Sequence, residues 1–304
     1  MNLFDKTLKQ QSELLLNKES YAYILVILFS GLPFISWFAL TIIAFVTLRK
    51  GSEAGLKILS VGIFTACLMQ FVISKGQVLA IDKALLTFAP VYLTAWILRA
   101  TSKWSDVIVT MLVLASAMIV YLYYFPPDLL FKMYQFFLTL MQEYKNTGPQ
   151  IREWLSNKDE VIAYILGIQA LVLVISTLSI LMLARALQAR LFYPQGFKQE
   201  MLSIRVHPIV LMVVVCMLLG FYFKQPIFLS LLPIWLAYLV ASGMSVLVNV
   251  FAANKAWLIF LLLLILLFLL PLFTLALFVG VGALDTVLNF RALIKKGNFP
   301  NRSS

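Results

Sequence analysis

Residues 256–291 read AWLIFLLLLILLFLLPLFTLALFVGVGALDTVLNFR, with no charged residue before Asp285. An α-helix rises about 1.5 Å per residue, so the uncharged part would be about 43 Å long, against a bilayer hydrocarbon core of roughly 30 Å. The stretch is too long for one upright membrane span. It is either one strongly tilted helix, or Pro271 divides it into two segments.

The whole chain has the composition of a membrane protein. Hydrophobic residues make up 62% of it and charged residues 12%, whereas soluble domains are roughly half apolar and about a quarter charged. Apolar runs follow one another with short connections, except at 126–160. We therefore predict one transmembrane helical domain at 21–293, with 126–160 as an extracytoplasmic loop, a polar cytoplasmic lead-in at 1–20 and a cytoplasmic tail at 294–304.

The first apolar run, at 21–48, is also over-long and is interrupted by Gly31 and Pro33. Between the two proline-broken runs, hydropathy predicts spans at about 54–74, 84–98, 105–125, 161–183, 208–223 and 227–253. The expected fold is an all-α polytopic transmembrane helical bundle. It has eight to ten membrane passages, depending on whether the two long runs are divided.

The basic residues favour division of both runs. Lys and Arg gather in the cytoplasmic loops of membrane proteins. With the N-terminus inside and both runs divided, most of the 24 Lys and Arg residues lie on the cytoplasmic side, and the other arrangements separate them less clearly. Both termini are then cytoplasmic. The short first segment leaves a re-entrant or broken helix as an alternative.

The loop at 126–160 contains a predicted amphipathic helix. Pro126, Pro127 and Asp128 are suited to a helix start. The polar residues that follow recur at intervals of three or four and form a narrow stripe beside a wide apolar face. We expect this helix to lie on the membrane surface or to cap the bundle.

Several functional classes have no support in the sequence. The net charge of +11 is spread in small groups between apolar runs, which indicates anionic lipid and cytoplasmic loops rather than nucleic acid. Cys67 and Cys216 sit inside apolar runs and predict no disulfide framework. With His207 as the one histidine, a two-histidine zinc site cannot form. We expect no enzyme, no metal and no cofactor.

Asp285 is the first candidate site residue. A carboxylate at membrane depth needs a partner or a wet cavity, because its burial in lipid is costly. Gly282 one turn earlier leaves room for a neighbouring side chain, and Asn289 one turn later is placed for a hydrogen bond. Asp285 either contacts a solute or coupling ion, or it orders the end of the helix.

A polar face on the preceding span is the second candidate. Its residues recur at spacings of three and four, so they share one side of a helix, and they are Trp235, Tyr238, Ser242, Ser245 and Asn249. Such a stripe serves helix packing or lines a solute cavity. Together with Asp285 it is the predicted ligand-binding set.

The segment 185–207 is the third candidate. It is rich in basic and aromatic residues, and exposed aromatic and arginine residues are typical of protein interfaces. It either only sets membrane orientation or docks a cytoplasmic or membrane protein partner through Arg190, Phe192, Tyr193, Phe197 and Arg205.

Three segments resemble a known family: 48–55 with LRKG and a following Ala-Gly, 186–205 around ARLFYPQGFKQE, and 284–291, LDTVLNFR. In these the chain is similar to the YybS-like bacterial integral membrane proteins, a family of unestablished role, in its proteobacterial branch. The resemblance implies a multi-pass protein of the bacterial inner (cytoplasmic) membrane. Such proteins look distantly like the substrate-binding subunits of energy-coupling-factor transporters and like MreD.

Two hypotheses for function follow. The first is a solute-binding membrane subunit of a transporter, because proline-broken helices often line substrate sites. The second is a non-enzymatic scaffold for cell-envelope or membrane-protein assembly, acting through 185–207 and the amphipathic helix. The expected partners are the lipid bilayer, a small-molecule solute and a protein, with no nucleic acid.

Overall fold

The computed structural model describes residues 19–32, 34–73, 75, 80–125, 127–143, 155, 157–193, 196–251 and 256–290. These residues are organised in α-helices, and no strand occurs among them. The prediction of an all-α fold is therefore confirmed.

Contacts between residues divide the chain into two compact units. Unit 1 contains residues 1–111 and 175–200, and unit 2 contains residues 112–174 and 201–304. Each unit is described by itself below. The prediction of one transmembrane domain at 21–293 stays a prediction.

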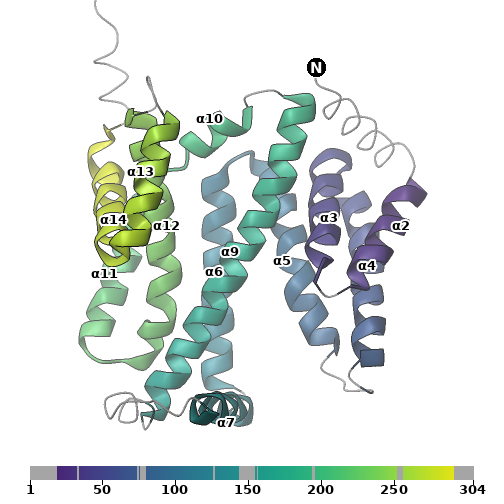
Figure 1. Ribbon diagram of the computed structural model, residues 1–304, viewed down its shortest axis with the longest axis horizontal. Helices are drawn as coiled ribbons and strands as arrows, with labels where there is room; N and C mark the ends of the chain where they lie inside the picture. Colours follow the sequence, from purple (N-terminus) through teal and green to yellow (C-terminus); the bar gives the residue numbers. More distant parts are fainter. Residues whose placement is uncertain are drawn as a thin grey trace, which may run out of the picture. The chain divides into compact units, whose positions relative to one another are not determined.

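Unit 1 is built on four consecutive helices, which are α2 (Glu19–Ser30), α3 (Ser36–Lys50), α4 (Ser52–Ile73) and α5 (Ala80–Thr101). It also holds the first turns of α6 (Trp104–Tyr124), the last turns of α9 (Lys158–Phe192) and most of α10 (Gly196–Leu202). In Figure 1, α2 and α3 form a pair beside α4 and α5, and these helices are in contact.

The first apolar run is divided as expected. α2 ends at Ser30 and α3 begins at Ser36. The sequence between them contains Gly31 and Pro33, and a proline disfavours helical backbone in the residue before it. Met69 of α4 lies beside Gly31, within 3.5 Å of where a β-carbon would stand. The turn is therefore level with the last turns of α4, a helix that ends at Ile73.

The core of unit 1 centres on Gly62 of α4. A β-carbon there would meet Phe88 at 3.1 Å, Val26 at 3.2 Å and Ile43 at 3.3 Å. These three side chains come from α5, α2 and α3 and are buried. All four helices therefore converge on a position that has no side chain, which permits close packing.

The α3–α4 connection is held by Arg99 of α5. Its Nη1 donates hydrogen bonds to the carbonyl oxygens of Leu48 at 2.9 Å and Thr47 at 3.3 Å. These carbonyls belong to the last turn of α3, where a cation is favourable, and that of Thr47 also accepts a hydrogen bond from the backbone N–H of Gly51 at 3.1 Å. Gly51, with φ of 113°, makes the turn into α4.

Unit 2 holds most of α6, the first half of α9 and five further helices, which are α7 (Pro127–Glu143), α11 (Pro208–Tyr222), α12 (Pro226–Phe251), α13 (Ala256–Leu269) and α14 (Pro271–Leu288). α7, α11, α12 and α14 all begin at proline, whose missing N–H has no helical partner at that position. α11 and α12 form a tight hairpin, in which Gly220 leaves room for the ring of Phe228.

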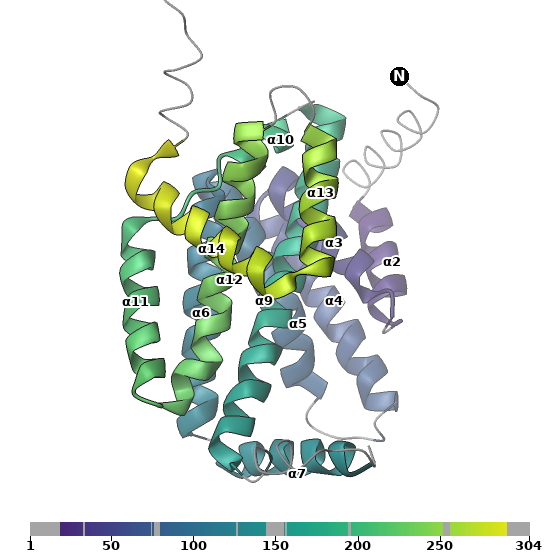
Figure 2. The ribbon, with the colours of Figure 1, turned by 60° about the vertical axis from the view of Figure 1, so that its left-hand side comes forward.

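The last apolar run is also divided. α13 ends at Leu269, Leu270 has non-helical backbone angles, and α14 begins at Pro271. Figure 2 shows the chain changing direction there, and α13 contacts α14. Of the two alternatives for this run, division at Pro271 is confirmed, because proline cannot donate the hydrogen bond that would continue α13.

α7 is the predicted amphipathic helix. It lies across the ends of α6 and α9 (Figure 1), and its Leu130 is buried against Ile162 and Leu166 of α9. Phe136 on another side is 67% exposed. The helix therefore caps this end of unit 2, and its position on a membrane surface stays a prediction.

Six of the described helices are long and apolar enough to cross a membrane. They are α4, α6, α9, α14 and the segments Ile81–Thr101 of α5 and Pro226–Val248 of α12. This supports the expectation of a membrane protein. α3 and α13 have 15 and 14 residues, or about 22 Å, less than a full span. The predicted eight to ten passages are not confirmed.

Candidate functional site

A cavity of about 220 Å³ lies in unit 1 at the break between α2 and α3. Four helices contribute to its wall, which is lined by Ser30, Gly31, Ser36, Ala66, Met69, Gln70, Ile73, Ala84, Thr87 and Phe88. At roughly 30 Å³ per water molecule, the space equals about seven waters. It is smaller than the pockets of about 300–1,000 Å³ that hold drug-sized ligands, so it suits a small solute.

Ser30 is the most distinctive polar group of the cavity. The residue is only 5% exposed, and its Oγ has no hydrogen-bond partner within the described part of the chain. A buried hydroxyl is usually hydrogen-bonded, since leaving it unpaired costs about 1–3 kcal/mol. Ser30 is therefore placed to bond a molecule in the cavity.

The helix break brings backbone dipoles to the same place. Ser30 ends α2 and Ser36 begins α3, and both line the cavity. The N-cap of α3, Ile35, makes no side-chain hydrogen bond to the helix. The end of one helix and the start of the next thus border the cavity with opposite partial charges, as in transporters whose broken helices contact substrate.

The wall opposite the break combines polar and apolar groups. Thr87 of α5 donates its hydroxyl to the carbonyl oxygen of Lys83 at 2.8 Å, which leaves its lone pairs able to accept. Gln70 of α4 adds an amide, and Met69 and Phe88 add apolar surface. This mixture of a few polar groups with apolar surface is typical of small-molecule sites.

Sequence reasoning missed this cavity. The break at Gly31 and Pro33 was visible, and broken helices are known substrate-site elements. The signal that identifies the site is the pair of serines at the two helix ends, together with Gln70, an amide inside an apolar run. Which residues of α4 and α5 face the break depends on packing and cannot be read from spacing.

The predicted ligand-binding face of α12 is occupied by hydrogen bonds within unit 2. Trp235 donates from Nε1 to Ser116 at 3.0 Å, Tyr238 donates to the carbonyl oxygen of Arg205 at 2.9 Å, and Ser245 donates to that of Met201 at 2.9 Å. Ser242 is fully buried. The side chain of Asn249 lies outside the described residues. A ligand-binding role for this face stays a prediction.

Asp285 is fully buried on α14. Nη2 of Arg205 donates to the carbonyl oxygens of Asp285 at 3.2 Å and Thr286 at 3.1 Å. The guanidinium thereby donates hydrogen bonds to carbonyl groups in the last turn of α14, which ends at Leu288. The contact brings the backbone of Asp285 together with Arg205, which the sequence had assigned to different candidate sites.

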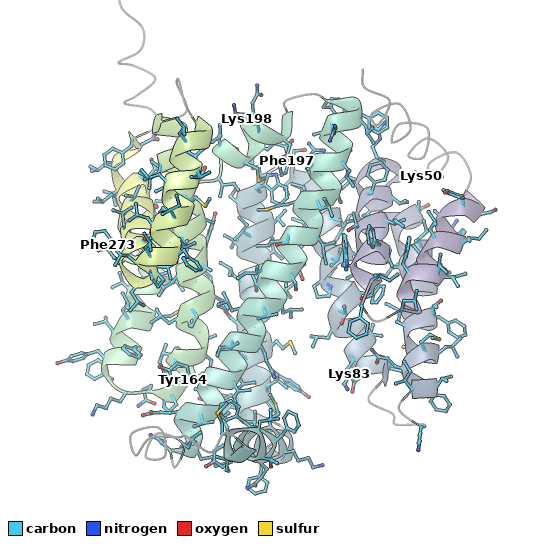
Figure 3. All side chains as sticks on the ribbon, in the orientation of Figure 1. Lys50, Lys83, Tyr164, Phe197, Lys198 and Phe273 are labelled. Atoms are coloured by element: carbon cyan, nitrogen blue, oxygen red, sulfur yellow. The ribbon has the colours of Figure 1, made fainter. Side chains whose placement is uncertain are left out.

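The other predicted docking residues differ in exposure. Tyr193 is 57% exposed and Arg190 is exposed, whereas Phe192 and Phe197 are partly buried. The guanidinium of Arg49 lies 3.8 Å from the ring centroid of Phe192, a cation–π contact. Lys198 projects outward from α10 (Figure 3). The docking role of these residues stays a prediction.

A polar cluster in unit 1 ties α10 to α6 and α9. The guanidinium of Arg185 forms a salt bridge with Glu200, with Nε donating to Oε2 at 3.0 Å. Trp104 donates from Nε1 to the same oxygen at 3.1 Å. Burial by itself raises the pKa of Glu200, but the hydrogen bonds from Arg185 and Trp104, with the charge of Arg185, outweigh it and lower that pKa overall.

The remaining chemistry-bearing residues have structural positions. His207 is the N-cap of α11, where its Nδ1 accepts a hydrogen bond from the backbone N–H of Ile209 at 3.3 Å. Cys67 and Cys216 form no disulfide among the described residues. Among the described residues, no group of three His, Cys, Asp or Glu side chains is close enough to hold a metal ion.

No protein family, curated protein or solved structure matches this chain. The resemblance to YybS-like proteins therefore stays a prediction.

Proposed function

We propose that this chain is a solute-binding membrane subunit of a transporter, with its solute site in the cavity at the α2–α3 break. The observation that carries the proposal is the buried, unpaired hydroxyl of Ser30 in the wall of that cavity. A helix interrupted at membrane depth beside a small polar cavity is the arrangement by which many transporters hold a substrate. The site relies on binding groups, and we propose no enzymatic activity.

The cellular context is part of the same proposal. The chain lies in a bacterial inner membrane, with both termini in the cytoplasm, as the basic residues and the resemblance to YybS-like proteins suggest. The helix breaks at 31–35 and Leu270 support two passages at each end. Its partners are lipid and a small solute, with no nucleic acid.

Ligand-induced thermal stabilisation of the purified protein tests the solute site. Libraries of vitamins, nucleobases and small metabolites are screened against the wild type and against Ala84→Leu, which fills the wall at a residue that is 1% exposed. The matched control is Ala117→Leu at an exposed position of α6. We expect a stabilising compound that loses its effect only in Ala84→Leu. No stabilising compound, or equal effects in both variants, would contradict the proposal.

A scaffold function is the second candidate. The exposed ring of Tyr193 and the outward Lys198 favour it (Figure 3). Crosslinking in cells with a photoreactive residue at 193 or 198 tests it, with Thr101, exposed at the end of α5, as the control position. A protein captured from 193 or 198 and not from 101 would support the scaffold. Capture of lipid alone would count against it.

A further inference from the structure

Among the described residues, the wall of the α2–α3 cavity carries no ionisable side chain. Its polar members are Ser30, Ser36, Gln70 and Thr87, and its other members are glycine, alanine and larger apolar residues. Hydroxyl and amide groups can donate or accept hydrogen bonds but hold no full charge. The cavity therefore offers hydrogen bonds of defined direction, but no charged side chain that could pair with an ion.

The residues around the cavity do not supply the missing charge. Lys75, Asp82 and Lys83 flank the α4–α5 connection, but they are exposed and do not line the cavity. Figure 3 shows Lys83 near the start of α5. Six residues next to these segments in the chain lie outside the described residues and are uncharged by sequence, namely Pro33, Ser74, Gly76, Gln77, Val78 and Leu79.

An ion in this cavity would lose hydration without gaining a partner of opposite charge. Burying an isolated charge is far more costly than burying a hydrogen-bonded polar group. The partial charges at the two helix ends have opposite signs. They therefore favour a ligand that has a dipole over a ligand that has a net charge. A neutral molecule with both a donor and an acceptor satisfies Ser30 and leaves no charge exposed to apolar surface.

We infer that the cavity selects small uncharged solutes that carry hydrogen-bonding groups, and that it excludes ions of either sign. This inference rests on the proposed solute-binding function and narrows it to a chemical class. The cavity volume of about 220 Å³ suits a small solute. Carboxylates, phosphates and amines in their charged forms are excluded as ligands.

Thiol labelling of Ser30→Cys tests the inference without a known ligand. Purified protein carrying Cys67→Ala and Cys216→Ala is treated with methanethiosulfonates in two size-matched pairs. The cationic trimethylammonioethyl reagent is paired with neutral 3,3-dimethylbutyl, and the anionic sulfonatoethyl reagent with neutral methylsulfonylethyl. Thr101→Cys, exposed at the end of α5, gives the reference rate for each reagent. Ser36→Cys repeats the measurement from the start of α3, at a partly buried residue of the wall, in case Ser30→Cys folds poorly.

After normalisation to position 101, each neutral reagent is expected to react with the introduced thiol at least about 10-fold faster than its charged partner. Equal rates within about 3-fold would overturn the charge selectivity and leave solute binding standing. Failure of all four reagents at 30 and 36, with normal labelling at 101, would show that the cavity admits no solute. That result would overturn this inference and the proposed function together.

Discussion

Gly282 of α14 lies directly against the carbonyl oxygen of Leu239 on α12, with no space for a β-carbon between them. The contact is reciprocal, because Gly243 of α12 faces the backbone of Phe278 on α14 in the same way. Glycines at helix crossings in membranes allow backbones to approach closely. This crossing buries Asp285 one turn further along α14.

Gly282→Ala is expected to destabilise the protein by about 1–3 kcal/mol, because the new methyl group overlaps backbone that cannot move aside. Gly280→Ala in the same helix is the control, since a β-carbon there meets nothing within 4 Å. We expect its effect to stay within about 0.5 kcal/mol. Denaturant unfolding in detergent micelles measures both. Equal effects would mean that the α12–α14 contact is not tight.

Arg205→Met should lower stability by about 1.5–3 kcal/mol, because it removes charged hydrogen bonds from the carbonyls of Asp285 and Thr286. Asp285→Asn should reduce that loss if the guanidinium, in addition to its bonds to the backbone, compensates the charge of the buried carboxylate. A double-mutant cycle measures the coupling between the two residues. Additive effects would show that Arg205 acts on the helix end alone. Arg190→Met, at an exposed position, is the control for losing a cation.

Glu200→Gln should destabilise the protein by about 1.5–3 kcal/mol at pH 7, because it breaks the charged hydrogen bonds with Arg185 and Trp104. The folded pKa of Glu200 lies below its ordinary value of 4.5. The contribution of ionised Glu200 to the free energy of unfolding is therefore present above about pH 4.5. It disappears as the pH falls through the pKa of Glu200 in the folded protein.

The difference in melting temperature between wild type and Glu200→Gln should accordingly shrink between pH 7 and pH 4. Glu53→Gln, exposed in the first turn of α4, controls for removal of a carboxylate. A difference that stays constant or grows in acid would contradict the ion pair as the source of stability.

Tyr238→Phe and Ser245→Ala each remove one hydrogen bond to the segment 201–205. Each should cost about 0.5–1.5 kcal/mol of unfolding free energy and leave ligand-induced stabilisation unchanged. Ser30→Ala should leave the unfolding free energy unchanged, because its hydroxyl has no partner to lose within the described chain. It should remove the ligand-induced stabilisation. Loss of ligand response from the α12 variants would move the solute site to unit 2.

Much of the fold could be predicted from the sequence. The expected span at 54–74 corresponds to α4, and that at 208–223 to α11, within about two residues. Both long runs divide near a proline, which cannot donate the helical hydrogen bond of its own turn, although α5 and α12 continue through Pro90 and Pro233. Local chemistry decided these features, so local reasoning found them.

Two features were missed by sequence reasoning. α9 continues to Phe192, beyond the expected end at residue 183, because the alanines and leucine that follow favour helix even outside an apolar run. The site residues are the second case. Periodicity identified a polar face on α12, but only packing reveals that its hydroxyls bond to backbone, whereas Ser30 has no such partner.

The uncharged wall at the α2–α3 break also bears on how such a protein responds to membrane voltage. Moving one elementary charge through 100 mV involves about 2.3 kcal/mol. On the proposed function, a neutral solute held by neutral side chains brings no charge into the field, so its binding to this site does not depend on the membrane voltage. A cell could depolarise its membrane without emptying or filling this site.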